Sequence, residues 1–374
     1  MVKKGSEQHV NSDYEIMIVG GGPAGISTWL HLQKHNPDLA AKCVLIEKAK
    51  YPREKLCGGA LHKWMTTKIL NNLNIQVTIP SVSIDTIEIH FGSDIYKYQE
   101  NNFFRIIRRI EFDNLLAKTA IKRGLQLHEN EQFLDMNRCN NKLLIKTNKG
   151  IYNVKVLVGA DGALSLVRRK MNMSIQPHFA ATIEIFSPLN PTYDPEFSKK
   201  TAVLDFSAVN QGLQGYVWHF PCLYDDKPIM NHGICDTRII PDTTRPDMKK
   251  IFKEELTKRH ITREIKSWSG HPITYLPDGG SLSQPNILLV GDAAGIEPLL
   301  CGGIHLALAY GEVAATTISN SFQNNDFSLI EYTQIIQNHY LGKYIQKFTA
   351  AAKYIYTEKT KILDTFAKIM AYKK

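Results

Sequence analysis

The stretch from Tyr14 to Leu32, YEIMIVGGGPAGISTWLHL, changes character abruptly at three consecutive glycines. Residues 15–19 predict a buried strand, and residues 26–32 predict a helix. Between them, Gly20, Gly22 and Gly25 fit G-x-G-x-x-G. In this pattern the first glycine allows a tight turn, the second lets a pyrophosphate approach the backbone, and the third lets helix pack on strand. The N–H groups of the helix N-terminus would favour an anion. The stretch therefore predicts a dinucleotide-binding turn.

A second strand supports this interpretation. CVLIEK, residues 43–48, is apolar and contains Glu47 close to the expected spacing of about 20 residues past the glycines. A carboxylate at this point could accept hydrogen bonds from the ribose hydroxyls of an adenosine, and it disfavours a 2′-phosphate. NAD or FAD therefore fits better than NADP, and the choice between them stays open here. The alternative is an ordinary exposed glutamate at a strand end.

Composition narrows the class of protein. The 374 residues are 43% hydrophobic and 22% charged, enough for the cores of two or three domains. The net charge of +9 suits acidic ligands or an anionic membrane surface, although solvated lysines alone also produce it. No nucleic-acid motif, signal-peptide core or apolar run of ~20 residues is present. The six scattered cysteines form no C-x-x-C pair, which argues against a metal site and favours a cytoplasmic chain with reduced thiols.

The pattern along the chain suggests α/β material at both ends of a β-rich middle. Residues 77–98 and most of 180–273 read as strands, with a helix around 246–260. Residues 108–124 predict a helix, and a hairpin turning at 148–150 leads into a buried strand at 154–158. From about Leu306 the chain is mostly helical.

We expect an α/β fold, α+β overall, in which a Rossmann-like nucleotide-binding domain is interrupted by a β-sheet substrate domain. The predicted nucleotide-binding parts are residues 1–76, 105–175 and 280–325. The predicted substrate-domain parts are 77–104 and 176–279, and 326–374 forms a C-terminal helical segment.

Two further glycine-acid turns follow apolar strands. VLVGADGALSLVRR contains Asp161 and Gly162, and ILLVGDAAGIEPLLCGGI contains Gly291 and Asp292. Three such turns at separate strand ends suggest a long ligand laid across a sheet edge. Asp292 can bind a ribityl hydroxyl, and the helix opening after Gly303 can aim its N-terminus at a negatively charged isoalloxazine edge.

Together the three turns resemble those of FAD-dependent oxidoreductases with the para-hydroxybenzoate hydroxylase fold, over most of residues 14–315. The resemblance implies FAD, with Glu47 on the adenosine ribose and Asp292 on the ribityl chain. It also implies that Arg109, four residues before Asp113, lies near the pyrophosphate. The alternative for Arg109 is a surface arginine that opens a helix.

Two segments are similar to one branch of that superfamily. YPREKLCGGAL, residues 51–61, looks like the P-R-x-K-x-C-G-G segment of the geranylgeranyl reductase family, and GYVWHFPC, residues 215–222, like its Y-x-W-x-F-P segment. Tyr216, Trp218 and Phe220 alternate, so they share one strand face and could wall an apolar pocket or simply pack a core.

The turns and the resemblance together give a set of cofactor-binding candidates. These are Gly20, Gly22, Pro23, Ala24, Gly25, Glu47, Lys48, Cys57, Gly58, Gly59, Arg109, Asp161, Gly162, Gly291, Asp292, Gly302, Gly303 and Ile304. Cys57, Tyr216 and Trp218 are candidates to line the flavin and substrate pocket. Cys57 could tune the flavin, react if its pKa is lowered, or only fill space.

The chain also departs from the family pattern. Cys301 occupies the position of the first glycine in the usual G-x-G-I ending. Where the family tends to carry a glycine pair soon after F-P, here only Gly233 follows, at a longer distance. The W-x-W-x-I-P segment of flavin-dependent halogenases is missing. His62, His219 and His305 lie near these segments as candidate proton donors, without an assigned role.

These observations lead to an FAD-dependent oxidoreductase whose flavin is reduced by NADH or NADPH. A reductase of prenyl carbon–carbon double bonds is the preferred activity. A flavin monooxygenase acting on an apolar substrate is the alternative, and a non-catalytic prenyl-binding protein is a remote one. We expect an apolar small-molecule or lipid partner and no nucleic acid.

The C-terminal segment combines apolar residues at helical spacing with an excess of lysines. These are Lys343, Lys347, Lys353, Lys359, Lys361, Lys368, Lys373 and Lys374, against Glu358 and Asp364. A basic amphipathic helix pair can lie on an anionic membrane. The favoured alternative is that its apolar face packs on the FAD domain and the lysines face water.

Overall fold

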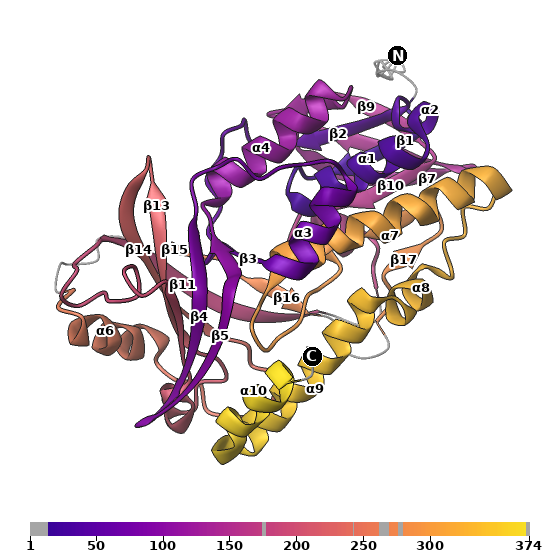
Figure 1. Ribbon diagram of the computed structural model, residues 1–374. Coiled ribbons are helices and arrows are strands. Elements are labelled where there is room, and N and C mark those ends of the chain that lie inside the picture. Colours follow the sequence, from indigo (N-terminus) through magenta and orange to yellow (C-terminus); the bar gives the residue numbers. More distant parts are fainter. Residues whose placement is uncertain (1–13, 174–176, 242, 262–268, 276–279, 372–374) are drawn as a thin grey trace, which may run out of the picture.

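The computed structural model describes residues 14–173, 177–241, 243–261, 269–275 and 280–371 of the chain. Within this part, the strands form a mainly parallel sheet, a larger mixed sheet and a small antiparallel sheet (Figure 1). Lys373 and Lys374 lie outside the described residues.

The parallel sheet carries the glycine turns. In spatial order its strands are β17 (Ser283–Gln284), β18 (Ile287–Leu289), β10 (Val156–Gly159), β1 (Ile16–Val19), β2 (Cys43–Glu47) and β6 (Gln126–Glu129). Only the edge pair β17–β18 is antiparallel. Strands β1, β2, β10 and β18 are buried along their whole lengths, as expected for a parallel sheet covered on both faces.

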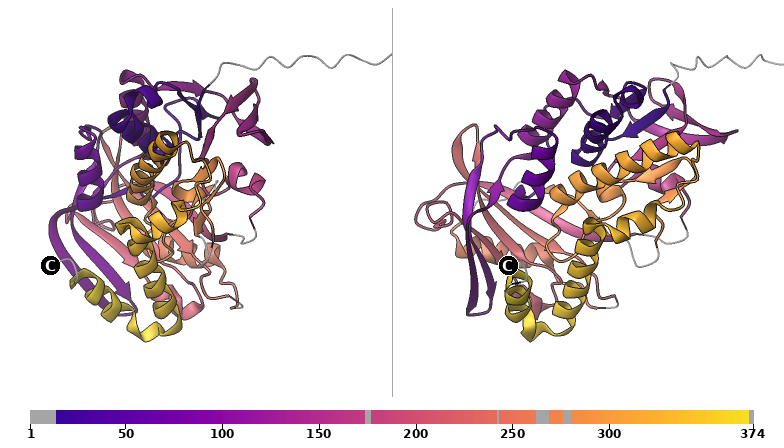
Figure 2. Two further views of the ribbon diagram at one scale, coloured as in Figure 1. Left: turned by 90° about the vertical axis from the view of Figure 1, so that its right-hand side faces the viewer. Right: turned by 45° about the vertical axis from the view of Figure 1, so that its right-hand side comes forward.

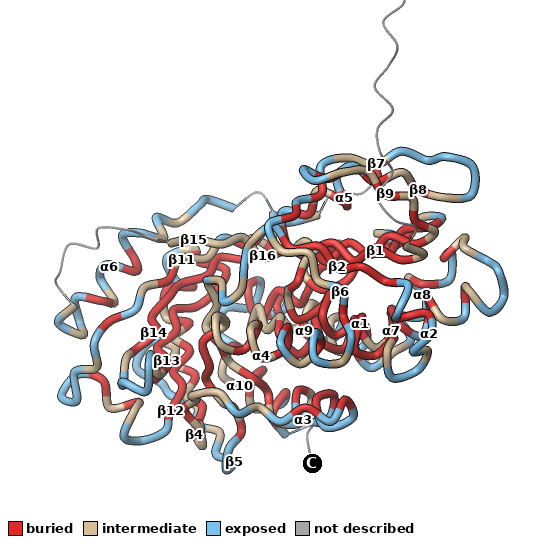
Figure 3. Tube along the Cα trace, turned by 90° about the horizontal axis from the view of Figure 1, so that it is seen from above, coloured by how far each residue is buried: buried red, intermediate tan, exposed pale blue. Residues whose placement is uncertain are grey.

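Helices and a small sheet provide this cover. Helices α1 (Pro23–His35) and α7 (Gly303–Asn324) lie side by side on one face of the parallel sheet. The antiparallel strands β7 (Phe133–Cys139), β8 (Lys142–Thr147) and β9 (Ile151–Val154) lie on the other (Figure 3). The apolar runs at 16–19, 43–47 and 156–159 thus sit in the middle of a three-layer core.

The mixed sheet is the second main layer. Its strands run in the order β15 (Ser269–Gly270), β11 (His178–Pro188), β14 (Lys227–Asp236), β13 (Val217–Tyr224), β12 (Thr201–Asp205), β4 (Val82–Phe91), β5 (Asp94–Ile106) and β3 (Ala60–His62), with β16 (Ile273–Tyr275) also paired to β11. The remaining helices near these sheets are α2 (Pro37–Ala40), α3 (Lys63–Asn72), α4 (Arg109–Lys122), α5 (Leu166–Lys170) and α6 (Met248–Lys258).

The C-terminal helices cover part of the mixed sheet. Helix α8 (Tyr332–Asn338) leads into α9 (Tyr340–Thr357), and α10 (Ile362–Ala371) contacts β4 and β5 (Figure 2). From Phe348 onward, the buried apolar side chains of α9 and α10 belong to the same cluster as Tyr216 and Trp218, whereas Tyr332, Ile336 and Leu341 belong to the core of the parallel sheet. Lys343 and Lys368 are exposed. The favoured expectation for this segment holds for the start of α9, where Leu341 packs into the core of the parallel sheet, and is wrong for α10, which packs on the mixed sheet.

Several local predictions are confirmed. The predicted helix at 108–124 is α4, the helix around 246–260 is α6, and the hairpin turning at 148–150 is β8–β9. Helix α1 begins at Pro23 rather than at residue 26, because proline is favoured in the first helical turn, where its missing N–H costs nothing. Strand β5 continues past the predicted end at 98 to Ile106. The numbered domain boundaries stay a prediction.

Candidate functional site

The first glycine turn is shaped by close backbone contacts. Gly20 has φ +106°, and a Cβ there would overlap the carbonyl oxygen of Ala160 on neighbouring strand β10. A Cβ on Gly25 would overlap the carbonyl oxygen of Gly20. Around Gly22 the situation is different, because a Cβ would meet only the Nη2 atoms of Arg53 and Arg109, each 4.0 Å away. The turn thus leaves an open position between the start of α1 and two guanidinium groups.

The two arginines are held by buried acids. Arg109 donates to Asp113 through Nε at 2.7 Å and Nη2 at 2.8 Å, and Arg53 Nη1 lies 3.2 Å from the same carboxylate. Although burial works against the charge of Arg109, Asp113 raises the pKa of the guanidinium well above its ordinary value. Two fixed positive charges beside a helix N-terminus fit a pyrophosphate. Arg109 is therefore not the free surface arginine of the alternative interpretation.

Glu47 lies on the other side of the same turn. Its Oε2 accepts from Gly21 N at 2.9 Å, its Oε1 accepts from Ala49 N at 3.0 Å, and Arg53 Nε lies 3.4 Å from Oε2. The side chain is buried, so Glu47 is not an ordinary exposed glutamate. A carboxylate fixed next to the turn is where an adenosine ribose needs an acceptor. Lys48, by contrast, is exposed and outside this cluster.

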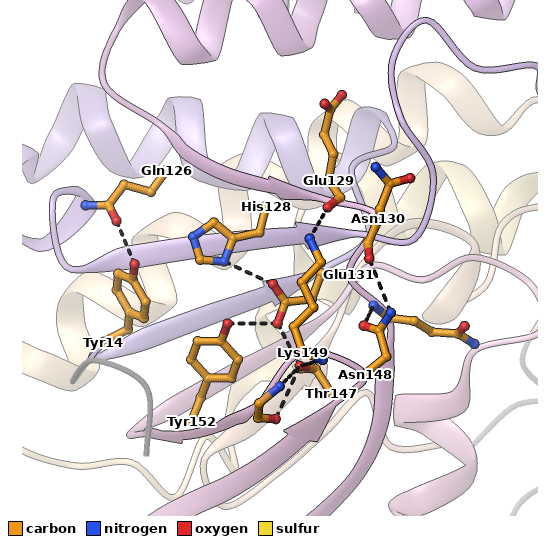
Figure 4. Close-up of polar contacts among 12 residues, drawn as sticks. Tyr14, Gln126, His128, Glu129, Asn130, Glu131, Thr147, Asn148, Lys149 and Tyr152 are labelled. Carbon is orange, nitrogen blue, oxygen red and sulfur yellow. Dashed lines mark hydrogen bonds and ion pairs between the residues drawn. The ribbon is translucent and has the colours of Figure 1, made fainter. Parts of the chain in front are cut away.

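A polar network supports the strand ends next to Glu47. Glu131 accepts from Thr147 Oγ1 at 2.7 Å and Tyr152 OH at 2.8 Å, and His128 Nδ1 lies 3.1 Å from its other oxygen (Figure 4). Its backbone N–H donates to the carbonyl of Glu47 at 2.9 Å. An open surface depression of about 570 Å³ here is lined by Lys50, Leu127, His128, Glu129, Asn130, Glu131, Lys149 and Tyr152. This mainly polar lining does not suit a prenyl chain.

The second turn uses its acid internally. Asp161 accepts from Ser165 Oγ at 2.5 Å, Leu166 N at 2.7 Å and Val167 N at 3.1 Å, so it caps the start of α5. Burial raises the pKa of Asp161, and these hydrogen bonds oppose the shift. A Cβ on Gly162 would meet nothing within 4 Å, so this turn offers open space at its backbone rather than a free carboxylate.

The third turn lies against the first. A Cβ on Gly291 would lie 2.7 Å from the Cβ of Ala24. A Cβ on Gly303, at the start of α7, would lie 3.3 Å from Oδ1 of Asp292. Arg168 ties the second and third turns together, donating to the carbonyls of Ala163 at 2.5 Å and Ala293 at 2.8 Å. The three predicted turns therefore meet at one edge of the parallel sheet.

The loop before α7 is held by one buried acid. Glu297 accepts from Leu299 N at 2.7 Å, Leu300 N at 2.9 Å and Gly302 N at 2.8 Å. Burial raises the pKa of Glu297, and the three N–H donors oppose that shift. Cys301 has φ +55°, so it does occupy a left-handed position of the kind that a glycine would adopt without strain. Gly302 and Ile304 flank this helix start.

The Cys57 segment meets the predicted aromatic wall. A Cβ on Gly58 would lie 3.1 Å from Phe220, and Gly59, with φ +78°, passes directly over the carbonyl of Ile107. Trp218 and Phe220 are buried, with ring centroids 6.4 Å apart. Tyr216 donates from its hydroxyl to the carbonyl of Leu300, in the loop before α7. The wall thus borders both the Cys57 segment and the α7 loop.

The sequence analysis did not identify three functional candidates, Arg53, Lys55 and Glu184. Arg53 and Lys55 lie in the Y-P-R-E-K segment, residues 51–55. Arg53 joins the acid cluster, and Lys55 contacts His271. Burial lowers the pKa of Lys55 to about 8, while Asp292 acts in the opposite direction. Burial also lowers the pKa of His271 to about 4, so this partner is neutral at pH 7. The third, Glu184, comes from distant strand β11 and gave no local signal.

The three histidines separate into two groups. His62 and His305 lie with ring centroids 5.9 Å apart near the start of α7. His219 lies on the face of β13 opposite Trp218, with its Nδ1 2.7 Å from Nδ1 of His232. Burial and nearby Arg259 hold the pKa of His219 well below its ordinary value. His219 is therefore a poor proton donor for the aromatic wall.

Comparison with known families decides the cofactor class. The FAD binding domain family matches residues 13–303, most of the chain. The chain belongs to this family. As an FAD-binding oxidoreductase it is an enzyme. Its residues fit the cofactor: Glu47 would hold the ribose, Arg53, Arg109 and the N-terminus of α1 would hold the pyrophosphate, and Asp292 would hold the ribityl chain.

This enzyme is similar over nearly its whole length to several known proteins. It is 26% identical to digeranylgeranylglycerophospholipid reductase 3 of Methanosphaera stadtmanae, covering 96% of this chain and 91% of that protein. It is 25% identical to the digeranylgeranylglycerophospholipid reductase of Thermoplasma acidophilum, covering 91% and 87%. These matches show that the enzyme is geranylgeranyl reductase-like in sequence.

Solved structures confirm the fold. A geranylgeranyl bacteriochlorophyll reductase-like protein from Thermoplasma acidophilum has a TM-score of 0.71 at 21% identity, covering 94% of this chain and 88% of that one. A p-nitrophenol 4-monooxygenase from Pseudomonas putida has a TM-score of 0.65 at 13% identity, covering 96% and 97%. At these identities the likeness concerns the fold, which serves both reductases and monooxygenases.

Proposed function

We propose that this enzyme reduces carbon–carbon double bonds of an isoprenoid chain, with electrons that NADH or NADPH delivers through FAD. The observation that carries the proposal is the contact between the Cys57–Gly59 segment and the aromatic wall of Tyr216, Trp218 and Phe220. The names of the curated relatives, which describe reductases of isoprenoid lipids, support the same substrate class.

The residues have separate tasks in this proposal. FAD supplies hydride chemistry when it is bound. Arg53, Arg109 and Asp292 hold its polar chain, and the aromatic wall excludes water and gives a prenyl chain an apolar surface. Because Tyr216, Trp218 and Phe220 are buried aromatic side chains, recognition of the chain would rest on shape and apolar contact.

A monooxygenase is the second candidate. Cys301, at the usual glycine position before α7, changes the loop at which substrate and flavin would meet. The fold also serves a p-nitrophenol 4-monooxygenase. The preference for a reductase comes from the two family-like segments, 51–61 and 215–222, which border the same site.

Product analysis separates the two activities. The holoenzyme is supplied with NADH or NADPH and a geranylgeranyl substrate, once without oxygen and once in air. We expect a saturated product that forms without O₂. An oxygenated product that requires O₂ would establish the monooxygenase instead. Comparing NADH with NADPH in the same assay identifies the electron donor.

A variant tests whether the aromatic wall holds the chain. Trp218→Ala should raise KM for a prenyl substrate, because the buried indole would no longer cover the chain. The rate of flavin reduction by NAD(P)H should stay within about twofold, because this half-reaction needs no prenyl chain. An unchanged KM in a folded, flavin-loaded variant would place the substrate elsewhere.

A further inference from the structure

Two side chains of the mixed sheet hold the backbone of Cys57 from both sides. Glu184 Oε1 accepts from the backbone N–H of Cys57 at 3.1 Å. Asn231 Nδ2 donates to the carbonyl oxygen of Cys57 at 3.2 Å. Both side chains are buried, with Glu184 5% and Asn231 1% exposed. A buried carboxylate and a buried amide thus both hydrogen-bond to the backbone of one residue that is distant in sequence.

Strand register explains how the two side chains come together. Glu184 on β11 pairs with Gly233 on β14, and Asn231 lies two residues from Gly233, so both point to the same face. Gly233 pairs in turn with Trp218 on β13. This face of three adjacent strands therefore carries the two polar residues and the aromatic wall.

Trp218 determines how the Asn231 amide is turned. Its indole Nε1 donates to Asn231 Oδ1 at 2.9 Å, which leaves the Nδ2 group to donate to Cys57. A side chain at position 233 would overlap the Trp218 ring, so Gly233 gives the indole the room for this contact. Asn231 thus connects Trp218 of the aromatic wall to the backbone of Cys57 through hydrogen bonds.

The segment is also held at both ends. On one side, the Arg108 guanidinium lies 3.2 Å from the Glu54 carboxylate and contacts the rings of Phe186 and Tyr224. On the other side, the carbonyl of Gly59 accepts from Ile107 N at 3.0 Å. Between these contacts, Glu184 and Asn231 are the side chains that hydrogen-bond to the Cys57 peptide itself.

We propose that Glu184 and Asn231 are positioning residues that lock the Cys57 segment against the aromatic wall. The proposal deepens the proposed function, because it takes this segment as the border between flavin and substrate. Neither residue touches the reacting atoms in this account. Both act through Cys57, and Trp218 acts through Asn231.

The alkylation rate of the Cys57 thiol measures how firmly Glu184 and Asn231 hold this segment. Burial raises the pKa of Cys57, although Arg109 opposes the shift, so the thiol is protonated at neutral pH and slow to alkylate. Release of the segment would expose the thiol to water and remove the effect of burial. Three cysteines then give three readouts in one protein: half-buried Cys57, exposed Cys139, and Cys43 in the core.

The experiment measures iodoacetamide labelling of each cysteine by peptide mass spectrometry, on folded holoenzyme. The variants are Glu184→Ala, Asn231→Ala and Glu184→Gln, with Glu88→Gln on β4 as a matched control on the same sheet. We expect Cys57 to label about tenfold faster in both alanine variants, the size expected when one ordinary hydrogen bond no longer holds the segment. Glu184→Gln, which keeps an acceptor oxygen, should restore slow labelling.

The internal controls separate local release from unfolding. Cys139 should label equally in all variants, and Cys43 should stay protected. Unchanged Cys57 labelling in both alanine variants would overturn the proposal. So would equal acceleration of Cys57 and Cys43, because that result would mean global unfolding instead of release of one segment.

Labelling requires no turnover, so it is independent of the proposed reaction. If the wild type forms no saturated prenyl product while Cys57 is released as expected, the proposed function fails and the positioning role stands. If the wild type does reduce a prenyl chain but Cys57 labelling does not respond, the positioning role fails alone. A visible-spectrum shift of bound flavin in Glu184→Ala, absent in Glu88→Gln, would give the lock independent support.

Discussion

Asp292 is the acid that the third turn presents at the edge of the parallel sheet, next to the start of α7. Its electrostatic neighbours include Lys55 and Arg109. Unlike Asp161, whose oxygens cap α5, it can serve as an acceptor for a ribityl hydroxyl.

We expect Asp292→Ala to weaken FAD binding by about 1.5–3 kcal/mol, the usual value of a hydrogen bond to a charged group. The ratio of flavin to protein after gel filtration measures the loss. Asp364→Ala, which removes an exposed carboxylate on α10, is the matched control and should keep full occupancy. Equal flavin content in both variants would contradict the role given to Asp292.

Glu184 should make the free energy of unfolding depend on pH. Burial raises its pKa to about 7, while the Cys57 N–H and Arg108 oppose the shift. The folded state therefore binds a proton that the unfolded state has already released, and the stability from this group falls as pH rises from its ordinary value of 4.5 towards 7. The side chain introduced by Glu184→Gln cannot ionise. The unfolding free energy of this variant should therefore rise relative to that of the wild type as the pH increases from 4.5 to 7. Parallel pH profiles for the two proteins would show that Glu184 does not titrate there.

At the scale of elements, the loop that opens α7 depends on Glu297. Three backbone N–H groups converge on this buried carboxylate. A glutamine has only one acceptor oxygen and introduces a donor, so at least one of these N–H groups would lose its partner. We expect Glu297→Gln to lower the free energy of unfolding by about 1–3 kcal/mol, measured by urea denaturation. Glu312→Gln, further along α7, should change it by less than about 0.5 kcal/mol.

The elements also show what could be predicted from sequence. The three turns were predictable because each is local: a strand that runs into a glycine turn within a few residues, as at Gly20 and Gly291. Glu184 and Asn231 were not, because register between β11, β14 and β13 brings them to Cys57 from more than 120 residues away. Asp161 was only half predictable, since the sequence located the turn but not the use of its carboxylate as a cap.

At the scale of the molecule, α10 and the later part of α9 complete the core of the mixed sheet. Phe348, Ile355 and Phe366 are buried in the cluster that also contains Trp218. The apolar face that could enter a bilayer is therefore already covered by protein, and the exposed side carries lysines such as Lys343 and Lys353. Among the described residues, no helix is both long and apolar enough to span a membrane.

This arrangement predicts how the protein meets lipid vesicles. We expect no co-sedimentation with neutral vesicles, because the apolar faces of α9 and α10 already pack against the rest of the protein. Contact with anionic vesicles would involve the lysine side chains alone and should be lost by about 0.5 M salt, where screening is strong. Binding to neutral vesicles, or binding that survives high salt, would contradict this account of the C-terminal helices.

The central claim is that reduced flavin in this protein saturates a prenyl double bond. It is tested most directly by an anaerobic single turnover. The holoenzyme is first reduced with NADH or NADPH, freed of excess nicotinamide, and then mixed with a geranylgeranyl substrate in the absence of oxygen. The account predicts return of the oxidised flavin spectrum, with one double bond saturated for each flavin. A flavin that stays reduced until oxygen is admitted, and then yields an oxygenated product, would contradict it.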